Sequence, residues 1–255
     1  MKGYFETYRT VKKSFKQSVY ASLPPLDKIT RQISFLMTPL FIRCHISANA
    51  ASYLKGVSGL VASLLLCLGT QAGLVLGIML YFVTRQIMDL IDGNIARVTG
   101  TSSFYGKFID GFMDVFLLSL FRLALAYYLY ANHGPILLVW TGTLTALLAS
   151  YQHLIPDRYS AFRRWINDLN KVNEEVVRIK SPTLPIISRW ASRLHGVFLA
   201  VSIFEITVGL TGFFVVSLCD SLCAIYLHFK AAKNDINVRK ISPKAAEDFV
   251  ASNHQ

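Results

Sequence analysis

Six long apolar segments limit how this chain can fold. Each is close to the roughly 20 apolar residues that a helix needs to cross the hydrocarbon core of a bilayer. They lie near 47–69, 73–91, 106–130, 135–153, 195–210 and 213–230. Because backbone polar groups in lipid must be satisfied within the spanning segment, such runs fold as helices. With 53% hydrophobic residues over the whole chain, the sequence predicts an all-α, polytopic membrane protein with six transmembrane helices.

The segment before the first span is amphipathic. Residues 4–20 place aromatic and aliphatic side chains at near-helical spacing among basic ones, which is typical of an interfacial helix lying among the headgroups. Pro24 and Pro25 end this stretch, and a second amphipathic stretch follows over 26–42. We expect three parts: an interfacial arm over 1–45, a six-helix transmembrane domain over 46–230 and a polar cytoplasmic tail over 231–255.

The basic residues are distributed unevenly about the predicted spans. The formal net charge is +11, but the Lys and Arg residues lie between apolar runs, which favours anionic headgroups over nucleic acid as their partner. The connections at 70–72, 131–134 and 210–212 contain no Lys or Arg, whereas the 97–107 and 154–194 connections are basic. The positive-inside rule therefore predicts that both termini are cytoplasmic. We expect a multi-pass protein of a prokaryotic inner (plasma) membrane.

Four aspartates flank the predicted connection between the second and third spans. Asp89 and Asp92 are three residues apart, and Asp110 and Asp114 are four apart, so each pair shares one face of its helix. The short connection makes the two helices antiparallel neighbours, which brings the four carboxylates together at the cytoplasmic edge of the membrane.

Such a cluster needs cations, because desolvated carboxylates raise each other's affinity for protons. The ligands are all oxygen atoms, which suits Mg2+ or Mn2+, and two ions sharing carboxylates would clamp a pyrophosphate. Gly93 leaves room for a ligand to approach the backbone, and Arg97 supplies a forked cation for a phosphate. Gly106 allows close approach of helices.

Other cations lie near or within the spans. Lys55 and Arg122 are intramembrane cations, which could bind a phosphate of an acceptor or pair with Glu205 or Asp220. Arg85 and Lys107 flank the aspartates, where they could meet headgroups or the acceptor, and contact with headgroups is the expected role. In the 154–194 connection, the run Arg163-Arg164-Trp165 is expected to be a membrane-surface patch, and the connection could either cover the active site or merely join helices.

The spacing D-x2-D-G-x2-A-R-x8-G-x3-D-x3-D over residues 89–114 resembles the signature of the CDP-alcohol phosphatidyltransferase family (class I). Asn49 and Ser52 resemble the conserved opening of the family's first spanning helix. The resemblance implies one metal ion held by Asp89, Asp92 and Asp110, and a second held by Asp89, Asp110 and Asp114. Asp114 would also be the general base. The remaining implied roles are contact with the CDP group for Asn49, Ser52, Gly93, Arg97 and Ser103, and helix packing for Ala96 and Gly106.

The resemblance implies an enzyme of phospholipid biosynthesis that acts as a homodimer. The expected reaction transfers a phosphatidyl group from CDP-diacylglycerol to the hydroxyl of a small polyol, polyol phosphate or amino alcohol, and releases CMP. An alternative keeps this chemistry but uses a soluble donor such as CDP-inositol or CDP-choline, because residues 27–31 resemble the inositol-phosphate branch. A cation transporter is a remote alternative, since its acidic residues would be spread through the bilayer midplane.

Overall fold

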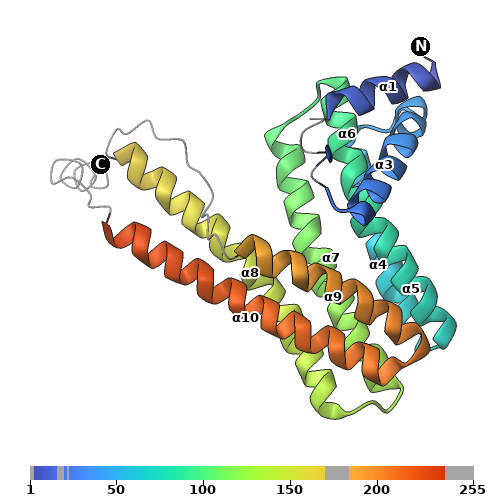
Figure 1. Ribbon diagram of the computed structural model, residues 1–255, viewed down its shortest axis with the longest axis vertical. Coiled ribbons are helices and arrows are strands. Elements are labelled where there is room, and N and C mark those ends of the chain that lie inside the picture. The colour runs from blue at the N-terminus through green and yellow to red at the C-terminus, as the bar shows by residue number, and fades with distance from the viewer. Residues whose placement is uncertain (1–2, 16–19, 22, 170–183, 239–255) are drawn as a thin grey trace, which may run out of the picture. The chain divides into compact units, whose positions relative to one another are not determined.

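The computed structural model describes residues 3–15, 20–21, 23–169 and 184–238, and these ranges are helical without any strand (Figure 1). The all-α prediction is confirmed for this part of the chain. The chain divides into two compact units, Met1–Val139 and Trp140–Gln255. The division falls inside the predicted 46–230 domain, so the predicted domain bounds stay a prediction. The helices of the first unit are α1 (Tyr4–Ser14), α3 (Pro25–Arg43), α4 (Ala48–Cys67), α5 (Gln71–Val83), the π-helical turn η1 (Thr84–Met88), α6 (Asp89–Thr99) and α7 (Phe104–Ala131).

Long helices make up the rest of the described chain. They are α8 (Ile136–Leu169), which begins just before the second unit, α9 (Leu184–Phe204) and α10 (Ile206–Val238). Helices α9 and α10 pack side by side (Figure 1).

Three helices in the described ranges are long and apolar enough to cross a membrane. They are Ala48–Cys67, Gln71–Thr99 and Ile206–Asn234. Each contains or overlaps a predicted span, namely the first, second and sixth. The other predicted spans lie largely within α7, α8 and α9, and their crossing of the bilayer stays a prediction.

The predicted connection at 210–212 is wrong. The helix breaks instead at Glu205, and α10 runs without interruption through Gly209 and Gly212. These glycines serve packing: a Cβ atom at Gly209 would lie 2.2 Å from the Ser202 backbone nitrogen, and one at Gly212 would lie 2.2 Å from the Phe198 ring. Small residues let helix backbones approach closely, which here joins α10 to α9.

The basic 154–194 segment is also more helical than a simple connection. Helix α8 continues to Leu169 through Pro156, and α9 begins at Leu184. Residues 170–183 and 239–255 lie outside the described residues, and with them most of the predicted polar tail. The prediction of a connecting segment is therefore wrong for the helical residues on both sides of 170–183.

Within the first unit, the N-terminal arm packs against the other helices through α1 and α3. Helix α1 ends at Ser14, earlier than the predicted 4–20 stretch, and α3 extends through Pro39 to Arg43. Both pack against α6. The Tyr4 hydroxyl donates to the Leu36 carbonyl oxygen at 2.8 Å, which joins α1 to α3. That this arm lies at a membrane surface stays a prediction.

Helix α4 is the centre of the first unit, because α5, α6 and α7 all pack against it. Its glycines allow this close packing. A Cβ atom at Gly56 would meet Met113 Sδ at 2.8 Å, and one at Gly59 would meet Leu117 Cδ2 at 2.5 Å. The N-terminus of α4 is capped by Ser47, whose hydroxyl accepts the Ala50 N–H at 3.2 Å. The face of α4 that holds Ser52 and Lys55 is thereby fixed against its neighbours.

Candidate active site

The first two aspartates lie within a helix that is longer than predicted. Helix α5 continues through η1 into α6, which extends to Thr99, beyond the predicted end of the span near 91. Gly100 ends α6 with a left-handed φ of 69°, a conformation that glycine adopts without strain. The π-helical turn directly precedes Asp89, and such turns are frequent at functional sites.

Three of the four motif aspartates converge. One carboxylate oxygen from each of Asp89, Asp110 and Asp114 lies within 4.8 Å of the other two, and all three side chains are partly buried. Asp89 comes from α6, whereas Asp110 and Asp114 come from one face of α7. The grouping matches the ligand set that the family resemblance implies for the second metal ion.

Two cations bind this cluster. Lys55 Nζ lies 2.9 Å from Asp89 Oδ1, 2.5 Å from Asp110 Oδ1 and 2.9 Å from Asp114 Oδ1. Arg85 Nη1 lies 2.8 Å from the same oxygen of Asp114. The sequence offered Glu205 or Asp220 as partners of Lys55, whereas the structure pairs its ammonium with the motif aspartates. Arg85, for which contact with headgroups was expected, forms an ion pair with Asp114, and its headgroup role stays a prediction.

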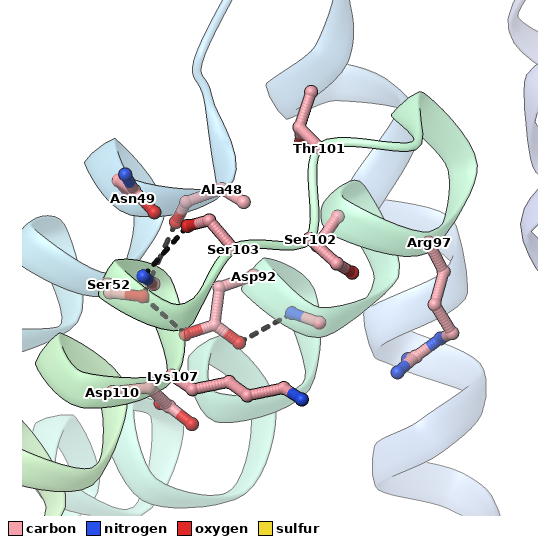
Figure 2. A pocket seen from close by; sticks show the side chains of 13 residues that line it. Ala48, Asn49, Ser52, Asp92, Arg97, Thr101, Ser102, Ser103, Lys107 and Asp110 are labelled. Atoms are coloured by element: carbon pink, nitrogen blue, oxygen red, sulfur yellow. Dashed lines mark hydrogen bonds between the residues drawn. The ribbon is translucent and has the colours of Figure 1, made fainter.

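Asp92, the fourth motif aspartate, is not part of this grouping of three and lines the adjoining pocket with Asp110. Its side chain is buried, its Oδ2 atom accepts the Ser52 hydroxyl at 2.7 Å, and its Oδ1 atom accepts the Gly93 N–H at 2.6 Å. Figure 2 shows the carboxylate directed toward Ser52, with Asn49 on one side of the pocket and Arg97 on the other. Asp92 thus joins α6 to α4 and lines the pocket between them.

The pocket has a volume of about 190 Å³ and opens beside the cluster. Its walls come from α4, α6, the 100–103 connection and the first turns of α7 (Figure 2). All five residues predicted to contact a CDP group line it: Asn49, Ser52, Gly93, Arg97 and Ser103. Asp92 and Asp110 line it as well, so acidic groups and the pocket form one site.

Sequence reasoning missed two polar residues of this wall, Thr101 and Ser102, and expected Lys107, which also lines it, to contact headgroups. The signal for Thr101 and Ser102 is their position in the connection between Arg97 and Asp110. The predicted packing residue Gly106 lies where a Cβ atom would be 2.9 Å from Asn49 Oδ1, so its small size lets α7 approach α4. Ala96 packs against a group of buried apolar side chains, those of Ala48, Ala51, Ile91 and Ile95.

Hydrogen bonds from α3 through Asn94 orient Arg97, which lines the pocket. Arg97 Nη2 donates to Asn94 Oδ1 at 2.7 Å, and the Asn94 amide donates to Ser34 Oγ at 3.3 Å and Thr38 Oγ1 at 3.2 Å. Asn94 is fully buried. Burial, together with the nearby Arg97 guanidinium, lowers the pKa of Arg31.

Arg97 also explains why glycine follows Asp92. A Cβ atom at Gly93 would lie 3.2 Å from Arg97 Nη1, so the guanidinium passes over the space that a side chain would fill. The other cation predicted to bind an acceptor, Arg122, is buried in α7, and its acceptor role stays a prediction.

The sequence model of the CDP-alcohol phosphatidyltransferase family matches residues 45–173, just over half of the chain. No curated protein matches the chain. The matched range contains the aspartate cluster and every residue of the pocket. The chain therefore belongs to the CDP-alcohol phosphatidyltransferase family and is a transferase, as the motif predicts.

Proposed function

We propose that the protein transfers a phosphatidyl group from CDP-diacylglycerol to the hydroxyl of a small polyol, polyol phosphate or amino alcohol, and releases CMP. The observation that carries this proposal is the junction of the pocket and the aspartate cluster. Asp110 belongs to both, so a pyrophosphate whose nucleoside half lies against Asn49 and Ser52 reaches the clustered carboxylates.

The cluster fits divalent metal ions. Its donors are carboxylate oxygens close enough to share one ion, and it already holds a cation, the Lys55 ammonium. Oxygen donors of this kind suit Mg2+ or Mn2+. We propose two ions, one held by Asp89, Asp110 and Asp114 and the other by Asp89, Asp92 and Asp110. When bound, they supply positive charge that stabilises the departing phosphate.

The residues of the chain have separate roles in the proposed reaction. Asp114 accepts the proton of the acceptor hydroxyl. Its ion pairs with Lys55 and Arg85 both end on Oδ1, so this role falls to Oδ2. The acceptor oxygen forms a bond to the β-phosphorus of the donor, and the bond from that phosphorus to the oxygen of CMP breaks. Arg97 and the backbone at Gly93 bind the CDP group and orient it.

The oligomeric state, membrane location and topology of the enzyme are also part of the proposal. The family resemblance supports a homodimer, and the three apolar helices support a membrane protein. The bias of Lys and Arg toward one side of the predicted spans supports cytoplasmic termini and a site that faces the cytoplasm of a prokaryotic cell.

CMP release tests the reaction. Purified protein in detergent is given Mg2+ or Mn2+, CDP-diacylglycerol and a panel of hydroxyl acceptors, beside an Asp114→Asn variant. We expect CMP release that depends on one class of acceptor and that the variant loses. CMP release from CDP-inositol or CDP-choline, but not from CDP-diacylglycerol, would replace the donor with a soluble one.

A further inference from the structure

Lys55 occupies the space that the three clustered carboxylates enclose. An ammonium group has three N–H donors, and here each one faces a different aspartate, Asp89, Asp110 or Asp114. The side chain is only 1% exposed. The position follows from helix geometry, because Lys55 lies three residues after Ser52 on the face of α4 that packs against α6 and α7.

A divalent ion and this ammonium need the same three carboxylates. The cluster that could hold an ion consists of the same three aspartates, and Mg2+ or Ca2+ binds carboxylate oxygens at about 2.0–2.6 Å. Lys55 Nζ lies 2.9 Å from the Oδ1 atoms of Asp89 and Asp114. An ion held by the same three carboxylates would therefore lie in the space between them that Nζ fills, where repulsion between the two cations opposes their presence together.

We propose that Lys55 is a built-in counter-cation, which neutralises the aspartate cluster in the absence of metal and must be displaced when a divalent ion binds. Lys55 thereby sets the metal affinity of the site. This inference rests on the proposed function, because it takes the cluster to be the metal site. It assigns Lys55 a positioning role toward the carboxylates in place of the acceptor contact that the sequence suggested.

The test compares Mn2+ binding by the full-length wild type and a Lys55→Met variant, both purified in detergent without substrate. Free Mn2+ is measured by electron paramagnetic resonance. Methionine keeps the length of the side chain and removes its charge. We expect Lys55→Met to bind Mn2+ about tenfold more tightly or better, because the ion no longer competes with an ammonium held by three charge-assisted hydrogen bonds.

Lys107→Met is the matched control. Lys107 also lies at this site, but it is exposed and its ammonium lies 5.9 Å from the Phe104 ring centroid. Removal of an exposed, screened charge should change Mn2+ affinity by less than about threefold. If Lys107→Met tightens Mn2+ binding as much as Lys55→Met does, the loss of any positive charge near the site explains the effect, and the inference is overturned.

The remaining outcomes separate this inference from the proposed function. Equal or weaker Mn2+ binding by Lys55→Met, with clear binding by the wild type, overturns the displacement of Lys55 and leaves the metal site intact. No Mn2+ binding by either protein at millimolar concentration removes the metal site itself, and the proposed function with it.

A measurement on the wild type covers the case in which Lys55→Met does not fold. Lysines are reductively methylated with and without Mn2+ and quantified by mass spectrometry. We expect labelling of Lys55 to rise severalfold when Mn2+ frees its amine from the carboxylates, while labelling of Lys107 stays constant. Labelling of Lys55 that Mn2+ leaves unchanged would contradict the proposal.

Discussion

Replacement of Asn94 by leucine tests how the N-terminal arm supports the pocket. Asn94 is fully buried and connects Arg97 on α6 to Ser34 and Thr38 on α3. Leucine has a similar volume but no polar atom. The Asn94→Leu variant therefore removes the link between the arm and Arg97 without opening a large cavity.

The expected loss of stability follows from these contacts. The bond from Arg97 is short, at 2.7 Å, whereas those to Ser34 and Thr38 are long, at 3.3 and 3.2 Å. Both hydroxyls also donate to backbone carbonyl groups, so neither loses its acceptor. A net contribution of roughly 1 kcal/mol for the first bond and less for the others gives a loss of about 2 kcal/mol.

A loss of this size lowers the thermal unfolding midpoint of a protein this long by about 4–8 °C. Arg97 also loses the acceptor that orients it, so we expect KM for the CDP donor to rise about fivefold to tenfold while kcat stays within about twofold. The assays are thermal unfolding in detergent and CMP release at varied donor concentration.

Thr38→Val is the matched control, because it removes one contact of Asn94 and keeps the bond between Asn94 and Arg97. We expect a smaller fall in the midpoint and an unchanged KM. Wild-type values of both the midpoint and KM in Asn94→Leu would refute the idea that α3 orients Arg97 through Asn94.

Three further predictions concern close contacts and metal. Gly93→Ala should raise the KM for the CDP donor severalfold without loss of stability, because the new Cβ atom lies 3.2 Å from Arg97 Nη1. Steady-state kinetics measure KM and thermal unfolding measures stability, and an unchanged KM argues against the contact. Gly59→Ala places Cβ 2.5 Å from Leu117 Cδ2 and should destabilise the protein by about 1–3 kcal/mol. A Cβ atom at Gly111 meets nothing within 4 Å, so Gly111→Ala is the control that should keep its stability. Equal thermal unfolding midpoints for the two variants would show that α4 and α7 tolerate the added volume. Chelation with EDTA should abolish CMP release, and Mg2+ or Mn2+ should restore it; activity that survives chelation would exclude the proposed metal chemistry.

Local spacing was enough to predict which motif residues share a helix face. Asp110 and Asp114 are one turn apart on α7, and this relation needs no knowledge of tertiary packing. The position of Asn49 and Ser52 opposite Asp92 was available only through the family resemblance, because the approach of α4 to α6 depends on packing between distant segments.

The partners of buried cations could not be predicted in this way. Lys55 is compatible with any acidic group at a similar depth, and Glu205 and Asp220 satisfied that condition as well as the motif aspartates did. The choice is decided by Gly56 and Gly59, which let α4 pack tightly against α7 and so bring the Lys55 ammonium to Asp110 and Asp114.

The prediction of one helix boundary was wrong because glycine occurs both in turns and at close helix contacts. Gly209 and Gly212 resemble a turn signal between two apolar runs, yet both lie inside α10 at its contact with α9. The same lack of a side chain suits a turn and a close helix contact, and composition alone does not distinguish them. The actual break at Glu205 lacks a comparable glycine or proline signal.

The most direct test of the central claim follows the β-phosphorus of the donor. The protein is given CDP-diacylglycerol labelled with 32P at the β-phosphate, Mg2+ or Mn2+, and the acceptor that supports CMP release, and the lipids are separated by chromatography. Attack on the β-phosphorus predicts that the label moves into a new lipid containing the acceptor and that CMP is unlabelled. Label found only in phosphatidic acid, whether or not acceptor is present, would contradict phosphatidyl transfer.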